Sequence, residues 1–147
     1  MASHAQWLAV CVLLGVTVAV SAQESRPNVV LILADDMGLD SVSAFNPTMG
    51  LTTPAIDSLA VAGMSFLDAH STSGVCSPTR YALLTGRYNW RSRLKRGIVD
   101  KWERPLIAPD RLTIGEMFQD AGYDTACIGK WHLGLNWPDS DGEFTER

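Results

Sequence analysis

The sequence predicts an α/β fold in which a mostly parallel sheet is flanked by helices. Short apolar runs with strand character alternate along the chain with segments that carry helix start and stop signals, and this alternation is typical of parallel sheets. Polar residues directly follow two of the predicted strands. Because ligands of open α/β sheets bind outside the carboxyl ends of the strands, a functional site is expected at these positions.

Three segments have the character of strands. The first, residues 28–34, is a continuous aliphatic and β-branched run, which is the pattern of a strand buried on both faces. The second covers residues 64–69 and the third covers residues 123–128. A sheet that begins with three strands has an exposed edge and an incomplete core, so we expect the chain to be a fragment of a longer protein.

Helix signals lie between these strands. Residues 53–63 open with a threonine cap and a proline at the first helical position, and they close with a glycine. Residues 113–122 open with a threonine that has a glutamate three positions on, the pattern of a capping box. Between these two segments, a third helix is predicted to start near Cys76. Residues 89–109 have no clear period and are expected to form a long connecting excursion.

The first 22 residues predict a signal peptide, because a nearly unbroken apolar run from Trp7 to Val20 ends in a small-residue cleavage site. The run is shorter than the roughly 20 residues that span a membrane, and no stop-transfer pattern follows. Since the positive flank is missing, an uncleaved anchor stays the alternative. We expect a secreted or periplasmic protein that has no membrane association after cleavage.

The charge balance argues against a general nucleic-acid binder, since the chain has 12 basic and 16 acidic residues. One stretch departs from this balance, because basic residues outnumber acidic ones between residues 87 and 104. Such a stretch could gather an anionic substrate, or it could be a solvated connection. Its basic residues are Arg87, Arg91, Arg93, Lys95, Arg96, Lys101 and Arg104.

The pentapeptide Cys76-Ser77-Pro78-Thr79-Arg80 places a thiol, a rigid turn residue and a fixed cation at a predicted helix N-terminus. Unpaired N–H groups and the positive end of the helix dipole favour an anion there. Cys76 and Arg80 are one helical turn apart, so both can address one bound group. In an exported protein, a disulfide between Cys76 and Cys127 is the structural alternative.

This pentapeptide resembles the sulfatase signature Cys-x-Pro-Ser/Thr-Arg. Residues 27–38 resemble the first strand and metal-binding aspartate pair of that family, and residues 129–134, Gly-Lys-Trp-His-Leu-Gly, resemble a later motif. The resemblance covers almost all of the chain after about residue 25. It implies the alkaline-phosphatase-like fold, with residues 23–147 as the N-terminal, incomplete part of the catalytic domain.

The resemblance further implies a sulfuric ester hydrolase in which Cys76 is oxidised to Cα-formylglycine. A formylglycine-generating enzyme would be the maturation partner, and the substrate would be a sulfated small molecule or polysaccharide. Hydration of the aldehyde gives a gem-diol. One hydroxyl attacks sulfur, and the second then loses its proton and expels sulfate by C–O cleavage.

Asp35 and Asp36 are hard oxygen donors suited to Ca²⁺ or Mg²⁺, and the modified Cys76 is their implied companion as a metal ligand. Adjacent aspartates on a strand point to opposite faces, so both can ligate one ion only if the chain turns there, as Gly38 would allow. The alternative is an aspartate pair that merely closes a strand.

The resemblance gives three further residues a role. Arg80 would stabilise the modified residue, Lys130 would bind a sulfate oxygen, and His132 would assist proton transfer at the diol. The remaining ligands of the family lie in later sequence, so we expect the 147-residue chain alone to be inactive. Two rival functions stay open: a phosphate or phosphonate ester hydrolase of the same superfamily, and a non-catalytic exported domain.

Overall fold

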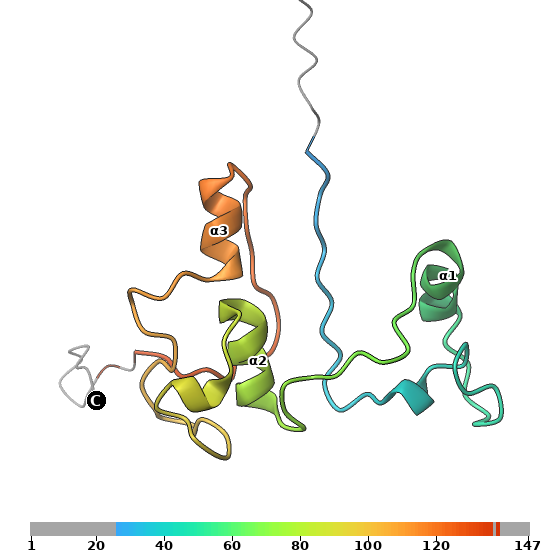
Figure 1. Ribbon diagram of the computed structural model, residues 1–147, viewed down its shortest axis with the longest axis horizontal. Helices are drawn as coiled ribbons and strands as arrows, with labels where there is room; N and C mark the ends of the chain where they lie inside the picture. Colours follow the sequence, from blue (N-terminus) through green and yellow to red (C-terminus); the bar gives the residue numbers. More distant parts are fainter. Residues whose placement is uncertain (1–25, 137, 139–147) are drawn as a thin grey trace, which may run out of the picture. The chain divides into compact units, whose positions relative to one another are not determined.

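The computed structural model describes residues 26–136 and 138, so the predicted signal peptide at residues 1–22 lies outside the described residues. The chain divides into two units, Met1–Leu33 and Ala34–Arg147. In the first unit the described residues form coil. The second unit holds every helix of the described chain (Figure 1): η1 Leu39–Ser41, α1 Pro54–Ala62, α2 Cys76–Thr85, η2 Asn89–Arg91 and α3 Ile114–Asp120.

The predicted helices are confirmed at the positions that the start signals gave. In α3, Thr113 Oγ1 accepts a hydrogen bond from the Glu116 amide at 3.2 Å, and Glu116 Oε2 accepts one from the Thr113 amide at 2.7 Å. This is the predicted capping box. Helix α2 begins at Cys76 and ends before Gly86, whose φ of 65° gives the left-handed turn that favours glycine.

Helix α1 begins as predicted, but Thr53 does not cap it with its side chain. The Thr53 hydroxyl instead donates to Asp57 Oδ1 at 2.8 Å. Asp57 also accepts from Ser43 Oγ at 2.6 Å and from the Ala44 amide at 3.0 Å. The first turn of α1 is therefore tied to the loop that precedes it through one carboxylate.

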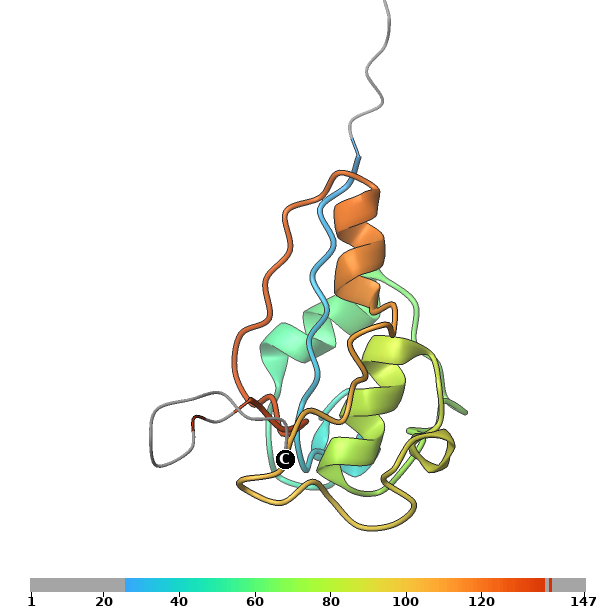
Figure 2. The same cartoon turned by 90° about the vertical axis from the view of Figure 1, so that its left-hand side faces the viewer.

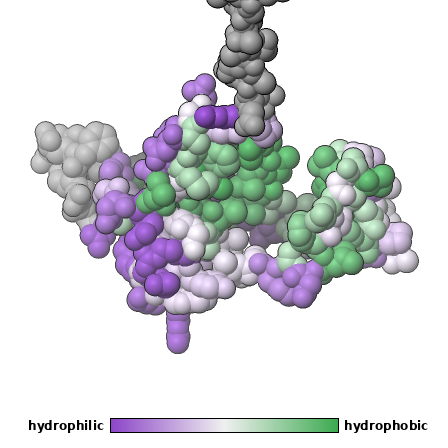
Figure 3. All heavy atoms as spheres, turned by 45° about the horizontal axis from the view of Figure 1, so that its top comes forward, coloured by the Kyte–Doolittle hydropathy of each residue, from purple (hydrophilic) through white to green (hydrophobic). Residues whose placement is uncertain are grey.

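The predicted sheet is not confirmed. Within the described residues, segments 28–34, 64–69 and 123–128 are coil rather than strand, and Figure 2 draws the residues after α3 as an open coil that runs back from the end of the helix. Their side chains stay in solvent, as Val30 at 80% and Ile128 at 95% exposure show. A strand buried on both faces gains its hydrogen bonds and its burial only from neighbouring strands. Figure 3 accordingly shows broad apolar areas on the surface.

The core forms around α2 from side chains that sequence periodicity does not reveal. Tyr81 of α2 packs in one buried cluster with Leu94, Val99, Leu106 and Leu133. Three of these residues come from the aperiodic excursion at 89–109. Asn89 is also buried there, and its amide donates to the Leu94 carbonyl at 2.8 Å. The excursion thus packs against α2 and is not a solvated connection throughout.

None of the helices in the described part of the chain is long and apolar enough to cross a membrane.

Asp57→Asn tests the link between α1 and its preceding loop. The hydroxyl of Ser43, with smaller help from Thr53 and the Ala44 amide, lowers the pKa of Asp57 below its ordinary 3.8. A lowered pKa means that the contribution to stability is complete above the ordinary value and is lost as pH falls through the folded value. We expect the variant to lose roughly two- to tenfold in hydrogen-exchange protection of the Ala44 amide at pH 6.

NMR-detected exchange between pH 6 and pH 3 gives the measurement. In the native chain, the protection of Ala44 should fall at the acidic end, whereas in the variant it should change little. Asp120→Asn, at the exposed end of α3, is the matched control and should leave Ala44 unaffected. Equal protection in all three proteins would contradict the assignment.

Candidate active site

Side chains from three distant segments of the second unit meet at the N-terminus of α2. Cys76 is the first residue of the helix. The ammonium of Lys130 donates to Cys76 Sγ at 3.1 Å and also to the carboxylate of Asp35. Cys76 Sγ lies 3.8 Å from Asp35 Oδ1. The structure therefore brings together the thiol, one aspartate and the lysine that the sequence predicted for the site.

Arg80 completes this cluster from one turn further along α2. Its guanidinium lies 3.4 Å from Asp35 Oδ2, and Nη1 donates to the backbone carbonyl of Lys130. The side chain is largely covered, with 12% of its surface exposed. Arg80 thus fixes both the carboxylate and the backbone that carries the lysine.

The cluster has a surplus of positive charge. Lys130 and Arg80 contribute two positive charges against the one negative charge of Asp35, which leaves one positive charge in excess. The N-cap residue of α2, Val75, offers no side-chain acceptor to the first-turn amides. Because these amides and the helix dipole add further positive potential, the site favours an anion next to Cys76.

The charges shift the titration of the two ion-pair partners in opposite directions. The hydrogen bond from Lys130 is the main cause that holds the pKa of Asp35 below 3.8. The hydrogen bond to Asp35 in turn raises the pKa of Lys130 above 10.5, with Cys76 as a second acceptor. The Asp35 contribution is lost as pH falls through its lowered pKa, and that of Lys130 is lost as pH rises through its raised pKa. Both groups therefore stay charged across the neutral range.

His132 does not hydrogen-bond to Cys76. Its Nε2 is 3.0 Å from the Val99 carbonyl. A carbonyl can only accept, so Nε2 carries a proton, and in the neutral ring Nδ1 is then the acceptor. Nδ1 is buried without a hydrogen-bond partner in the described chain. The structure thus holds the ring in one orientation and leaves one basic nitrogen unused.

Ser77 and Val99 are site residues that the sequence analysis missed. The Ser77 side chain is fully buried, and its Oγ accepts a hydrogen bond from the Val99 amide at 3.1 Å. The Val99 peptide thereby joins the first turn of α2 to the His132 ring. A polar residue directly after the cysteine was the available signal, but nothing in the sequence pointed to Val99 as its partner.

Asp36 makes no hydrogen bond or ion pair within the described residues, yet the backbone there does not rule out a metal pair. Its φ of 55° places a bend at Asp36 itself, two residues before the glycine that was expected to allow a turn here. The two residues are therefore not in strand geometry, and the opposite-face argument does not apply to them. Their carboxylate oxygens are the type of donor that a hard cation prefers.

The number of donors is nevertheless small. The described residues contain no group of three or more His, Cys, Asp or Glu side chains that could hold a metal ion. Ca²⁺ takes six to eight oxygen ligands, and Mg²⁺ takes six. Asp35 and Asp36 therefore fit as part of a ligand set that needs further oxygen donors.

Both described cysteines are free thiols, with Cys76 half-buried and Cys127 exposed. The disulfide alternative is therefore not formed in the structure.

The part of the chain that contains these residues is similar to known proteins. The family model described as Sulfatase matches residues 27–146. The chain is 41% identical over 110 residues to an N-acetylgalactosamine-6-O-sulfatase of Bacteroides thetaiotaomicron, a match covering 75% of this chain and 21% of that protein. It is 39% identical over 114 residues to arylsulfatase A of Bos taurus, covering 78% and 22%. With the steryl-sulfatase of Homo sapiens it shares 36% identity over 129 residues, covering 80% and 21%. The chain thus spans about a fifth of the length of these relatives.

Lys130→Gln should raise the pKa of Asp35, because Lys130 is the largest cause of its depression. Arg80 stays in place, so the pKa should move towards 3.8 without necessarily reaching it. Carboxylate NMR titration of ¹³C-labelled protein measures the shift. Lys95→Gln removes a cation whose ammonium contacts the Trp90 carbonyl instead, and it should leave Asp35 unchanged. An unaltered Asp35 titration in Lys130→Gln would show that the ion pair is absent in solution.

Gly134→Ala should destabilise the segment that carries Lys130 and His132. Gly134 has a φ of 78°, and a Cβ there would overlap the backbone carbonyl of Arg104. Gly97 is the matched control, because its φ is 75° but a Cβ would meet nothing within 4 Å. The left-handed conformation alone costs alanine about 1–2 kcal/mol, so Gly97→Ala should lose about that much. Gly134→Ala should lose clearly more in a denaturant titration, and equal losses would contradict the overlap.

Proposed function

The chain belongs to the sulfatase family, and from this premise we propose that residues 23–147 form the N-terminal part of the catalytic domain of a sulfuric ester hydrolase. The observation that carries the proposal is the meeting of Cys76, Lys130, Arg80 and Asp35 at the start of α2. These are the residue types that the family motifs supply, and they converge where an anion is favoured.

The substrate in this proposal is a sulfated small molecule or polysaccharide. The names of the relatives cover both a sulfated amino sugar and a sterol sulfate, so the sulfate ester is the shared element. Three features support sulfate recognition in this chain: the ammonium of Lys130, the guanidinium of Arg80 and the first-turn amides of α2. A tetrahedral oxyanion can accept hydrogen bonds from such groups on several of its oxygens at once.

We further propose that Cys76 is converted to Cα-formylglycine by a formylglycine-generating enzyme, a reaction that needs an external two-electron oxidant and releases the sulfur as sulfide. The hydrate of that aldehyde would supply one hydroxyl that attacks sulfur while the S–O bond to the alcohol breaks and the alcohol leaves with a proton. The other hydroxyl would then lose its proton, and C–O cleavage would release sulfate and regenerate the aldehyde. The free, half-buried thiol of Cys76 and the cation 3.1 Å from it support this position as the reacting one. Lys130 would orient the bound sulfate, and Arg80 would hold Asp35 and the lysine backbone in place.

Asp35, Asp36 and the modified Cys76 would bind the divalent cation of the site, Ca²⁺ or Mg²⁺, together with oxygen donors from other parts of the protein. Such an ion would supply Lewis-acid stabilisation of negative charge on the sulfate. The bend at Asp36 supports the use of both carboxylates. The Lys130 ammonium forms an ion pair with Asp35, so the lysine and the metal ion would both interact with that carboxylate.

His132 is proposed to move the proton at residue 76. Its unpartnered Nδ1 supports this role, because the nitrogen is an acceptor with no competing donor in the described chain. The Val99 carbonyl fixes the tautomer by engaging Nε2.

Export to the periplasm or the outside of the cell is part of the same proposal, with residues 1–22 as the signal peptide.

Cys76→Ala should abolish the hydrolysis of an aryl sulfate by the complete, matured protein, with a loss of at least about 10³-fold, whereas Cys127→Ala should retain activity. The Cys76 peptide of the native protein should react with a hydrazide probe for aldehydes. Aryl phosphate tested in parallel separates the rival hydrolase, which would turn over the phosphate faster. Full sulfatase activity in a protein whose Cys76 peptide keeps an ordinary thiol would contradict the proposal.

A further inference from the structure

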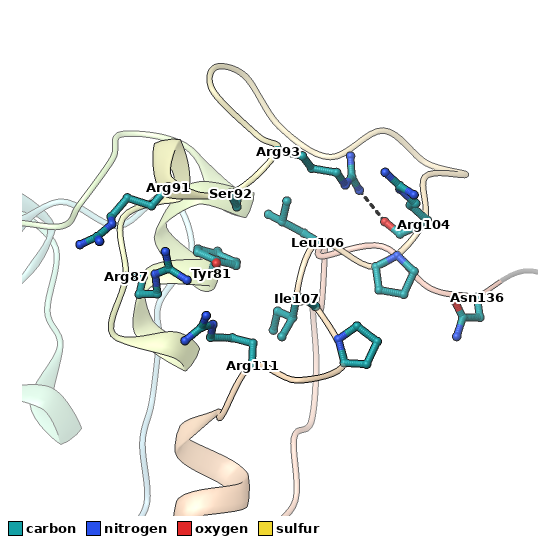
Figure 4. A pocket seen from close by; sticks show the side chains of 13 residues that line it. Tyr81, Arg87, Arg91, Ser92, Arg93, Arg104, Leu106, Ile107, Arg111 and Asn136 are labelled. Carbon is teal, nitrogen blue, oxygen red and sulfur yellow. Dashed lines mark hydrogen bonds between the residues drawn. The ribbon is translucent and has the colours of Figure 1, made fainter. Parts of the chain in front are cut away.

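Away from Cys76, the second unit contains a recess whose charge is almost entirely positive. The recess has a volume of about 360 Å³. Five arginines line it, and Figure 4 shows them around Tyr81, Leu106 and Ile107. No carboxylate is among its described lining residues. The five are Arg87, Arg91, Arg93, Arg104 and Arg111, and we call this feature the arginine recess.

Most of these cations have no partner of opposite charge in the described chain. Arg93 pairs with Glu103 at 2.7 Å and donates to the Arg104 carbonyl at 2.6 Å. The side chains of the other four arginines make no ion pair or hydrogen bond within residues 26–136 and 138. Among the described residues, five positive charges less the one that Glu103 balances leave four in excess around the recess.

Like charges so close together repel one another, and an anion in the recess would relieve that repulsion. Guanidinium groups bind sulfate, phosphate and carboxylate in a bidentate manner. The wall of the recess is not only charged, because Leu106 is buried beneath it and Ile107 is half-buried. An apolar wall with a few convergent cations suits an organic ligand that has anionic substituents better than it suits a bare ion.

The position of the recess relative to α2 restricts the length of a ligand that could also reach Cys76. Cys76 starts the helix, and Arg87 follows its end at Thr85. At about 1.5 Å per residue the two positions are on the order of 15 Å apart. A single small sulfate ester cannot reach both positions, whereas an extended molecule with several charged groups can.

We propose that the arginine recess is a second anion-binding site, which takes a further sulfate group of a sulfated oligosaccharide whose scissile ester lies at Cys76. This inference rests on the proposed function for the choice of ligand, and it selects the polymeric substrates from the class given there. The recess itself requires neither the aldehyde nor a metal ion, so its binding can be measured separately from catalysis.

Binding of a fluorescently labelled, sulfated dextran oligosaccharide to the unconverted full chain tests the proposal. We expect saturable binding that weakens with salt, no binding of neutral dextran of equal length, and clearly weaker binding of polyglutamate of equal charge. Arg87→Gln and Arg111→Gln, at the two half-buried cations of the recess, should each weaken binding by about tenfold. Arg96→Gln removes an exposed arginine of the same stretch that does not line the recess, and it should bind as the native chain does.

Two further variants keep the test decisive if a half-buried arginine proves necessary for folding. Arg91→Gln and Arg104→Gln alter exposed lining residues, and they should weaken binding while leaving circular dichroism and thermal midpoint unchanged. If the four lining variants lose no more affinity for the sulfated dextran than Arg96→Gln does, the assignment is wrong. Equal affinity for polyglutamate would also overturn it, because the recess would then respond to charge alone.

Kinetics of the complete, matured protein separate this inference from the proposed function. The lining variants should raise KM for the sulfated oligosaccharide and leave aryl sulfate turnover unchanged. If the protein hydrolyses no sulfate ester but still binds sulfated dextran through the recess, the hydrolase proposal fails and the recess stands. If it hydrolyses aryl sulfate with native rates while no lining variant alters oligosaccharide binding or KM, the recess fails alone.

Discussion

The contact between Lys130 and the pair formed by Asp35 and Cys76 is the constraint on which the rest of the site depends. It joins residues that are 95 and 54 positions apart in the chain. Each partner is partly open to solvent, so an isolated pair of this kind would contribute little to stability. Here the Arg80 guanidinium adds a second contact to each side, to the carboxylate and to the lysine backbone. The cluster therefore fixes geometry more than it adds stability, and geometry is what an anion site next to a reactive side chain requires.

The polar cluster can hold its shape because α2 is anchored beneath it. Tyr81 of the helix packs against buried side chains of the long excursion, and the Val99 peptide ties Ser77 to His132. Substituting Val99 by another apolar residue would keep those two backbone hydrogen bonds, whereas a backbone shift there would disturb both. The site is thus positioned by a loop whose residues carry no catalytic chemistry of their own.

Local signals predicted much of this arrangement, and long-range pairings account for what they missed. The capping box at Thr113 and the helix start at Cys76 are determined by neighbours within one turn, so the sequence reveals them. That Asp35, Cys76 and Lys130 share one site could be predicted only from the resemblance of their motifs to those of a known family, because the three residues are far apart in the sequence. The segment 28–34 shows the converse, since its strand pattern is strong but its hydrogen bonds must come from other strands. Val99 and Leu106 went unnoticed because core residues on an aperiodic loop leave no period to detect.

The two ends of α2 explain how one short helix can serve two anions. At its start, unpaired amides and the positive end of the dipole act directly on the anion beside Cys76. At its other end the dipole is negative and would repel an anion, but it favours the nearby cation of Arg87, just beyond the Gly86 cap. That attraction offsets a small part of the repulsion within the arginine recess. Because a helix is stiff, its length then sets the separation of the two sites, and a ligand that binds both must match that separation.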